Sequence, residues 1–327
     1  MTGDLILPPS PALPDLADRL IVPQLIADAG DRAALRFIEF FTAQIRNPNT
    51  RRAYGRAVGD FCGWCEDHGL ALPQLGPVHV AAYVEMLSET KSTPTVKQHL
   101  AALRVLFDWL VVGQVMATNP AMSVRGPKHV VETGKTPVLS AAEVRQVLDA
   151  IDADTEIGLR DRALIALLLY TFARIGAALK MKVEDVYRQE RRLWARLQEK
   201  GGKQHRMPCH HILEEYLLDY LERTGLAEQP KRVLFPTRDR KTRQLSERPL
   251  TQQEALAMIR RRLQAAEIDV PAGCHSFRAT GITVYLENNG TLERAQKMAA
   301  HASPRTTKLY DRTADRITQD EVERIQV

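Results

Sequence analysis

Apolar residues recur at every third or fourth position between residues 31 and 118, and this spacing predicts four amphipathic helices joined by short loops. The first covers residues 31–45, the second is capped by Asn49 or Thr50 and ends at Gly69, the third follows Pro77, and the fourth begins at Thr93. We therefore predict a compact all-α domain over residues 31–119.

The first 30 residues have no helical periodicity and contain five prolines, which are Pro8, Pro9, Pro11, Pro14 and Pro23. Proline removes a backbone donor and clashes inside a helix, so we expect residues 1–30 to form a flexible arm. No basic leader precedes the apolar residues of this arm, which is unlike a secretory signal. No stretch of the chain reaches the roughly 18 consecutive apolar residues of a membrane span, so we expect no membrane partner.

A segment rich in proline, glycine and polar residues separates the first domain from the rest of the chain. Residues 120–138 lack periodicity, and we predict that they form a linker.

The remainder of the chain, residues 139–327, mixes helical and strand patterns. Residues 163–172 form a strongly apolar run that predicts a buried helix. Apolar and polar residues alternate in 192–198, a glycine pair follows, and residues 205–208 are expected to return as a partner strand. Helical patterns resume after Thr251. The predicted fold class is therefore mainly α with a small antiparallel β-sheet, an all-α domain followed by an α+β domain.

Composition and charge narrow the class of protein only slightly. The length of 327 residues is enough for two domains at roughly 100–200 residues each. Apolar residues at 44% and charged residues at 26% exclude a disordered chain and a disulfide-rich miniprotein. The 45 Lys and Arg residues exceed the 40 Asp and Glu residues, and this modest excess is compatible with a polyanionic partner. Four cysteines are too few to staple such a chain, which favours a reducing, cytoplasmic location.

Six polar residues of the second domain are candidates for chemistry. They are Arg174 after the apolar helix, Lys200 at the predicted hairpin turn, His275 and Arg278 three residues apart, and His301 nine residues before Tyr310. Each has an ordinary structural explanation when it is taken alone, such as a surface ion pair for Arg174 or a core aromatic for Tyr310.

In this order and at this spacing, the six residues resemble the active site of the tyrosine recombinase (phage integrase) family, and the resemblance extends over the chain after residue 30. Residues 31–119 resemble that family's core-binding, SAM-like domain, and residues 139–327 resemble its catalytic domain. The sequence NPNTRRAY at residues 47–54 is common in family members from mobile elements. The resemblance implies a site-specific recombinase that cleaves and rejoins DNA through a 3′-phosphotyrosyl intermediate, without ATP, metal or another cofactor, for integration, excision or resolution.

The same resemblance implies the partners of the chain. The substrate would be double-stranded DNA at specific recombination sites, and the active assembly would be a homotetramer on two paired sites. A C-terminal segment often docks on the neighbouring protomer in this family. Val322 and Ile325, at helical spacing in an otherwise polar segment, fit such trans docking.

The residue types suit the implied chemistry. Attack on a phosphodiester builds negative charge on the phosphoryl oxygens, and the guanidinium groups of Arg174 and Arg278 can donate paired hydrogen bonds to such oxygens. Tyr310 would be the nucleophile. Because a phenol is unreactive near its ordinary pKa of about 10, we expect His275 to accept or orient the phenolic proton.

The resemblance implies roles for His301 and Lys200, and the chain departs from the family pattern at one position, Ala177. His301 would hydrogen-bond a phosphoryl oxygen, and Lys200 would protonate the departing 5′ oxygen. Lys203 follows in the same turn, and the Lys-Gly-x-Lys pattern of the family favours Lys200 over it. Many members carry an acid three residues after the first arginine, where this chain has Ala177, and this leaves the local support of Arg174 open.

Two cysteine motifs resemble metal or redox sites, but their context favours other roles. Cys62 and Cys65 have the spacing of a redox pair or half a zinc site, yet they lie on a helical apolar stripe, so we expect core packing. Cys209, His210 and His211 are adjacent, and neighbouring residues of an extended segment point to opposite faces. We therefore expect no metal site.

Basic residues form two clusters that are candidates for contact with the DNA backbone, although a charged run is as often a solvated face. The first is Arg46, Arg51, Arg52 and Arg56, and the second is Lys231, Arg232, Arg238, Arg240, Lys241, Arg243, Arg248 and Arg260–Arg262.

Three alternatives remain open at this stage. A type IB topoisomerase would use similar chemistry but relax supercoils without paired sites. A catalytically silent DNA-binding protein could retain the fold. A cysteine- or metal-dependent enzyme is disfavoured by the context of its candidate residues.

Overall fold

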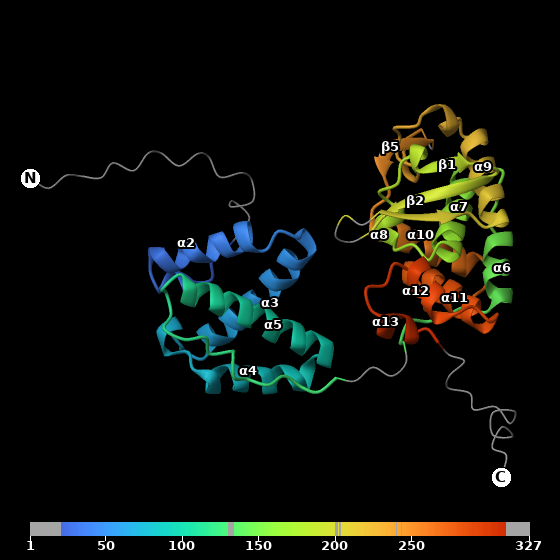
Figure 1. Cartoon of the computed structure of the whole chain (residues 1–327). Helices are drawn as coiled ribbons and strands as arrows, with labels where there is room; N and C mark the ends of the chain where they lie inside the picture. The colour runs from blue at the N-terminus through green and yellow to red at the C-terminus, as the bar shows by residue number, and fades with distance from the viewer. Residues whose placement is uncertain are drawn as a thin grey trace, which may run out of the picture. The chain divides into compact units, whose positions relative to one another are not determined.

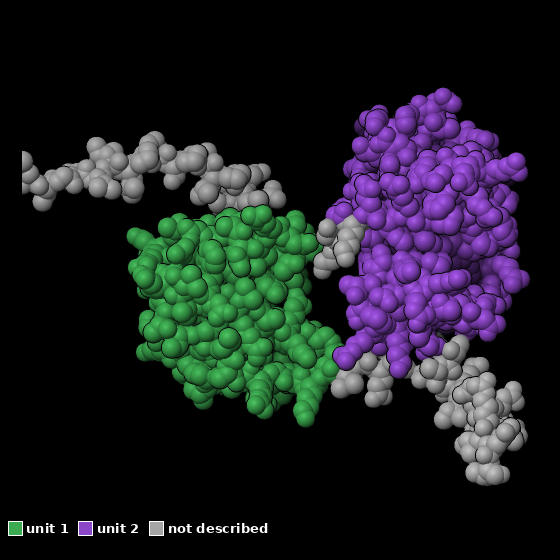
Figure 2. Space-filling model, in the orientation of Figure 1, with its two compact units in different colours: residues 1–130 green, residues 131–327 purple. Residues whose placement is uncertain are grey.

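The computed structural model of the chain (Figure 1) describes residues 21–129, 134–199, 202, 204–239, 241–242 and 244–311. The chain divides into two compact units, residues 1–130 and 131–327 (Figure 2). Each unit has a hydrophobic core of its own. Within the described ranges, no helix is both long and apolar enough to cross a membrane.

The first unit is helical throughout its described part. Its elements are α1 (Gln24–Ala27), α2 (Asp31–Glu39), the π-helical turn η1 (Phe40–Gln44), α3 (Pro48–Asp67), the 3-10 turn η2 (Leu72–Gln74), α4 (Pro77–Thr90) and α5 (Thr93–Val112). The four helices predicted from apolar periodicity are present, and the first of them continues from α2 into η1. The all-α class predicted for this part of the chain is therefore confirmed.

Helix α3 begins two residues earlier than expected, because Asn47 rather than Asn49 or Thr50 is its cap. The side-chain oxygen of Asn47 accepts hydrogen bonds from the backbone nitrogens of Asn49 (2.9 Å) and Thr50 (3.2 Å). Pro48 occupies the first helical position, where the missing N–H leaves no intrahelical bond unmade.

The expectation of a flexible arm over residues 1–30 is wrong for residues 24–30, while residues 1–20 lie outside the described part of the chain. Helix α1 follows Pro23, and its Leu25 and Ile26 side chains are 4% and 1% exposed. The backbone nitrogen of Leu25 also donates to the Glu66 carboxylate of α3 at 2.9 Å. A proline just before a helix does not oppose it, and the two apolar side chains gain burial against α3.

Cys62 and Cys65 lie in the core of the first unit, as their place on the apolar stripe of α3 predicts. Both thiols are free and buried, and Phe61 beside them packs edge-on against Tyr83 and Phe107. Burial raises the pKa of both thiols, which keeps them protonated and poorly suited to redox chemistry.

The second unit combines helices with two small antiparallel sheets. Its helices are α6 (Ala141–Asp149), α7 (Glu156–Tyr170), α8 (Ile175–Ala178), α9 (His211–Arg223), α10 (Gln252–Ala265), α11 (Cys274–Glu287), α12 (Leu292–Met298) and α13 (Pro304–Lys308), with 3-10 turns η3 (Val183–Asp185) and η4 (Leu226–Glu228). Its strands are β1 (Val186–Gln189), β2 (Arg192–Gln198), β3 (Gln204–Pro208), β4 (Pro236–Arg238) and β5 (Leu245–Pro249).

Helix α7 forms the centre of the second core, which explains its continuous apolar sequence. It packs against both α9 and α11. Gly281 lets α11 approach α7 closely, because a Cβ atom at this position would lie 2.1 Å from the Leu169 carbonyl oxygen. In Figure 1 strands β1, β2 and β5 gather toward one end of this unit, and α11, α12 and α13 lie toward the other.

The predicted hairpin is present as β2 and β3, whose register pairs Trp194 with Pro208 and Gln198 with Gln204. Strand β1 adds to the other edge of β2, so the sheet has three strands. A second sheet, of β4 and β5, lies in the segment that carries the second basic cluster. These strands are three and five residues long and have no alternating apolar pattern, so periodicity does not reveal them.

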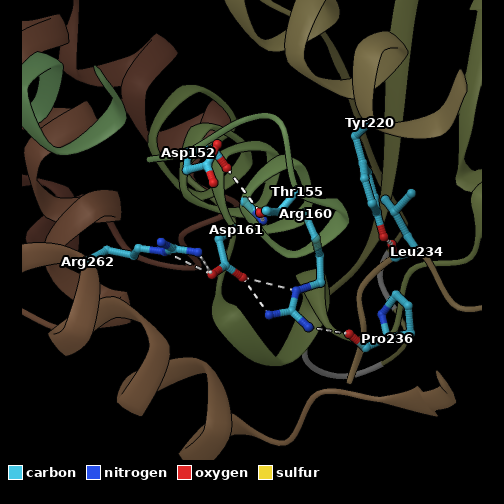
Figure 3. Close-up of polar contacts among 9 residues, drawn as sticks. Asp152, Thr155, Arg160, Asp161, Tyr220, Leu234, Pro236 and Arg262 are labelled. Atoms are coloured by element: carbon cyan, nitrogen blue, oxygen red, sulfur yellow. Dashed lines mark hydrogen bonds and ion pairs between the residues drawn. The ribbon is translucent and has the colours of Figure 1, made fainter. Parts of the chain in front are cut away.

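A buried ion-pair network joins three elements of the second unit (Figure 3). The Asp161 carboxylate lies between Arg160 on α7 and Arg262 on α10 and accepts hydrogen bonds of 2.6–3.0 Å from both. Arg160 also donates to the Pro236 carbonyl oxygen of β4 at 2.8 Å. The Asp161 side chain is only 1% exposed, so its charge depends on these two guanidinium groups for compensation.

Candidate active site

Four of the six candidate residues meet where α11, α12 and the segment after α13 pack together. Arg278, on α11, is fully buried and is held by three acceptors. Its Nη2 donates to the Ala299 carbonyl oxygen (2.7 Å) and to the His301 ring (2.6 Å), and its Nη1 donates to the Phe172 carbonyl oxygen at the end of α7. Two segments that are distant in sequence, one after α7 and one after α12, therefore fix this guanidinium.

Tyr310 lies beside Arg278 with its phenol directed at His275. The distance from His275 Nε2 to the Tyr310 hydroxyl oxygen is 2.9 Å. The tyrosine ring stacks on His301, with ring centres 5.8 Å apart, and Thr283 on α11 donates to the Tyr310 carbonyl oxygen at 3.1 Å. Tyr310 is therefore held on three sides within its own chain.

His275 is neutral in this setting. Burial lowers its pKa from the ordinary value of 6.5, and the positive charges of Arg278 and Arg174 lower it further. A neutral imidazole has one nitrogen that accepts, and in the tautomer with its hydrogen on Nδ1 this nitrogen is Nε2, which can receive the phenolic hydrogen. The 2.9 Å contact has the geometry that a general base requires.

His301 is also neutral, and its tautomer is fixed by its neighbours. Burial, followed by the charges of Arg278 and Arg174, lowers the pKa of His301 to about 4. Arginine only donates, so Nε2 must accept from Arg278, and Nδ1 carries the hydrogen that it donates to the Thr307 hydroxyl at 2.9 Å. In this arrangement His301 orients Arg278, and donation to a phosphoryl oxygen would require this pairing to change.

Arg174 interacts with the other site residues through its positive charge. It also pairs with a carboxylate that the sequence motifs did not indicate. It caps α8 and pairs with Glu199, which follows the last residue of β2. Ala177 on α8 carries no polar side-chain atom, so the carboxylate partner of Arg174 comes from the sheet instead of the helix. The positive charge of Arg174 contributes to lowering the pKa values of Arg278, His275 and His301.

Arg278 retains a positive charge at neutral pH, and one of its three nitrogens lacks a hydrogen-bond partner. Burial and the charge of Arg174 lower its pKa to about 10, while Tyr310 and Glu199 oppose the change. Its buried Nε has no hydrogen-bond partner. An unpaired donor on a buried cation is costly, and an anion that reached it would supply the missing acceptor.

Lys200 and its possible substitute Lys203 lie outside the described residues. The strands that flank the turn are described as far as Gln198 and from Gln204 onward. The predicted role of Lys200 therefore stays a prediction.

Sequence reasoning missed two residues of this site. Glu199 is one, and His205 on β3 is the other. Burial lowers the pKa of His205, whose environment includes the charges of Glu199 and Arg278, and its buried Nε2 has no hydrogen-bond partner. Neither residue belongs to a spaced motif. The register that sets Leu197 opposite His205 comes only from the paired strands.

The second basic cluster is less available to a polyanion than its sequence implies. Lys231 pairs with Glu184 and Arg248 with Glu254, while Arg262 belongs to the buried network around Asp161. Arg240 and Arg243 lie outside the described residues. In the first cluster, Arg51 donates to the Ile45 carbonyl oxygen.

The cysteine–histidine run before α9 has structural contacts. Cys209 is buried, and the His210 ring accepts a hydrogen bond from the Ile212 backbone as the α9 cap and stacks on Tyr170. Across the described ranges, no group of three or more His, Cys, Asp and Glu side chains is arranged to hold a metal ion.

Family models match both units of the chain. The model of the phage integrase family matches residues 137–316, and that of the phage integrase N-terminal SAM-like domain matches residues 36–113. The first match alone covers more than half of the chain.

Individual proteins and solved structures agree with these matches. The tyrosine recombinase XerD of Corynebacterium glutamicum is 30% identical over 289 residues, which span 83% of this chain and 90% of that protein. The post-cleavage complex of the XerH site-specific recombinase with a palindromic difH substrate has a TM-score of 0.68 at 17% identity, covering 94% of this chain and 92% of that one. A lambda integrase tetramer bound to a Holliday junction has a TM-score of 0.62 at 16% identity, covering 85% and 80%.

Proposed function

This chain belongs to the phage integrase family and is a site-specific tyrosine recombinase, and from this premise we propose that Tyr310 is the nucleophile that cleaves DNA. The observation that carries the proposal is the 2.9 Å contact between the Tyr310 hydroxyl and a neutral His275, next to the buried cation of Arg278. Nucleophile, proton acceptor and anion-binding group are then within one cluster of a single chain.

The cleavage step would proceed in line at the scissile phosphorus. The Tyr310 oxygen forms a bond to phosphorus as its proton passes to His275 Nε2, and the 5′ oxygen leaves with a proton from Lys200. Arg174 and Arg278 neutralise the charge that builds on the phosphoryl oxygens, and His301 acts on the same group by orienting Arg278 or by binding an oxygen. A 5′ hydroxyl of another strand reverses the step and rejoins the DNA.

The proposed substrate is double-stranded DNA at specific recombination sites, bound by a homotetramer. The similarity to recombinase–DNA complexes, one of them a tetramer on a Holliday junction, supports this assembly. Because these structures share less than 25% identity with the chain, the likeness itself is one of fold. The XerH and XerD relatives are recombinases, which favours this function over the topoisomerase and silent-protein alternatives.

We propose that residues 318–327, which lie outside the described part of the chain, dock on the neighbouring protomer in trans. A mostly apolar groove of about 700 Å³ on the second unit, lined by residues of α6, α9 and α11, supports this. Two arginines and one acid also line this groove, Arg145, Arg192 and Asp149, whereas the segment carries three acids, Asp320, Glu321 and Glu323, against one arginine, Arg324. Opposite charges at the rim would favour one binding orientation.

We also propose that the recombinase moves a mobile element and acts in the cytoplasm. The NPNTRRAY sequence supports movement of a mobile element, and the sparse cysteines support action in the cytoplasm. Neither bears on the chemistry.

The nucleophile is tested with a nicked DNA substrate that traps the covalent protein–DNA adduct. The wild-type chain should form the adduct, whereas Tyr310→Phe should form none and still bind DNA, because only the attacking oxygen is lost. Adduct formation by Tyr310→Phe at the wild-type rate would exclude Tyr310 as the nucleophile. Addition of a chelator should leave the wild-type rate unchanged, which also tests the metal-dependent alternative.

A further inference from the structure

We propose that Glu199 is a positioning residue for strand cleavage, which holds the Arg174 guanidinium so that its remaining donors face the scissile phosphate. This inference rests on the proposed function. No motif in the sequence marks Glu199.

The burial of the Glu199 and Arg174 side chains determines which side of the guanidinium the carboxylate occupies and which side a phosphate can reach. The Glu199 side chain is 4% exposed, whereas the Arg174 side chain is 38% exposed. The carboxylate therefore lies on the inner side of the guanidinium, and the outer side remains open to solvent. A phosphate that approaches from solvent can reach Arg174 without displacing Glu199.

The hydrogen bonds of Arg174 also leave donors of its guanidinium available for a phosphate. Among the described residues, Glu199 is the one hydrogen-bonding partner of its side chain, and the bond uses Nη1. A guanidinium carries five N–H donors in one rigid plane. Fixing Nη1 from within the protein restricts the orientation of that plane, and the donors left over are enough for a paired contact with two phosphoryl oxygens.

The charge of Glu199 also helps the site to assemble before substrate binds. Arg174 lowers the pKa of Arg278, which means that the two cations repel each other in the free protein. Glu199 opposes that effect on Arg278. Since Ala177 offers no carboxylate on α8, a single buried acid at the end of β2 supports both cations and is the source of local support that the sequence left open.

The same contact has an opposite interpretation, in which Glu199 occupies the place of the phosphate and inhibits the free enzyme. The two interpretations predict opposite signs for loss of the carboxylate. A positioning carboxylate leaves affinity for DNA nearly unchanged and supports the rate, whereas a competing carboxylate weakens both affinity and rate. The burial of Glu199 favours the first.

The test uses the full chain and compares Glu199→Gln with wild type for adduct formation on the nicked DNA substrate under single-turnover conditions. We expect the cleavage rate to fall about 10- to 100-fold, as for a misoriented catalytic group. Affinity for the same DNA should change by less than about threefold. Asp185→Asn is the matched control, because Asp185 also pairs with an arginine of the same sheet, Arg196 at 2.7 Å, but outside the site. The control should cleave at the wild-type rate.

A double-mutant cycle with Arg174→Ala separates positioning from general structural support. If Glu199 acts through Arg174, Glu199→Gln should lower the rate by less than about threefold in the Arg174→Ala background. An undiminished effect there would mean that Glu199 acts through the fold or through its sequence neighbour Lys200, and would overturn the proposal. Should Glu199→Gln not fold, as judged by its melting transition, Glu199→Asp enters the same cycle with the same expectation.

Two results would separate this inference from the proposed function. If wild type cleaves and Glu199→Gln cleaves equally fast or faster, the role of Glu199 is refuted and the function stands. If wild type forms no adduct while Tyr310→Phe behaves identically, the proposed function itself fails.

Discussion

At the scale of single residues, the site depends on two histidines that are both neutral but differ in their partners. His301 must accept from Arg278, because arginine has no acceptor. His275 faces the Tyr310 hydroxyl, which can donate or accept. Burial and two nearby arginines hold the pKa of each histidine below 6.5, so the phenol meets a base at neutral pH and not an acid.

The rate of cleavage should therefore depend on pH through His275. Its pKa is lowered, so the ring is neutral at and above pH 6.5 and gains a proton only as the pH falls below that value. We expect a rate that is level around pH 7 and falls about tenfold per pH unit below the pKa of His275. The measurement is the single-turnover rate of adduct formation between pH 4.5 and 8.

Stability must be followed over the same pH range. A histidine whose pKa is lower in the folded state stabilises the fold above its unfolded pKa, and this contribution is lost as the pH falls. His205, His275 and His301 all have lowered pKa values. Melting temperatures at each pH therefore identify the range in which the chain is folded. A rate that rose on acidification of the folded protein would contradict the base role of His275.

Which residues of the site could be found from sequence depends on how they are connected. Spacing within two short segments indicated the tyrosine, both histidines and the arginine of α11, since residues three apart on a helix share a face. Glu199 is 25 residues from Arg174, and no periodicity links them. They are in contact because β2 ends beside α8 in the folded chain. A tertiary contact of this kind leaves no pattern in the sequence.

At the scale of elements, periodicity predicted long elements well and short ones poorly. The helices α3, α4 and α5 and the β2–β3 hairpin follow from their apolar patterns. Helix α1 has four residues and β4 has three, so neither repeats its period often enough to be recognised. Tertiary contacts stabilise such short elements: α1 packs on α3, and β4 is held by the Arg160 contact to Pro236.

Asp161 should be essential for joining α7, α10 and β4. In Asp161→Ala the guanidiniums of Arg160 and Arg262 lose their shared acceptor, and Arg160 is left buried without an opposite charge. We expect the free energy of unfolding to fall by about 3–5 kcal/mol, the usual cost of breaking a buried ion pair. Equilibrium urea unfolding measures this change.

The control for this substitution is Asp219→Ala. Asp219 also pairs with an arginine, Arg162 at 2.7 Å, but its side chain is 32% exposed. A pair of this kind contributes roughly 1 kcal/mol or less. Equal losses of stability in the two variants would show that the Asp161 network has no special role in the core.

At the scale of the whole molecule, the first described residues of the second unit contact the segment that carries Tyr310, the proposed nucleophile. The backbone nitrogen of Gly134 donates to the Leu309 carbonyl oxygen at 2.9 Å, one residue before Tyr310. The Leu139 nitrogen donates to Thr280 on α11 at 3.0 Å. The sequence predicts a linker up to residue 138. It does not indicate that the end of this linker contacts the segment of Tyr310, because a backbone hydrogen bond requires no particular residue type.

Assembly should depend on the C-terminal segment and on the groove proposed to receive it. Deletion of residues 318–327 should weaken formation of complexes with two paired sites by about tenfold or more, while binding to a single site stays nearly unchanged, because trans docking joins protomers and does not contact DNA. Native gels with one-site and two-site DNA measure both.

Arg145→Glu combined with Arg192→Glu places two acids at the rim of the groove and should reproduce the assembly defect in the full-length chain. Both arginines are exposed, so these changes should leave the fold intact. Paired-site assembly unaffected by the deletion would exclude trans docking, whereas a deletion defect that the groove variant does not share would place the docking surface elsewhere.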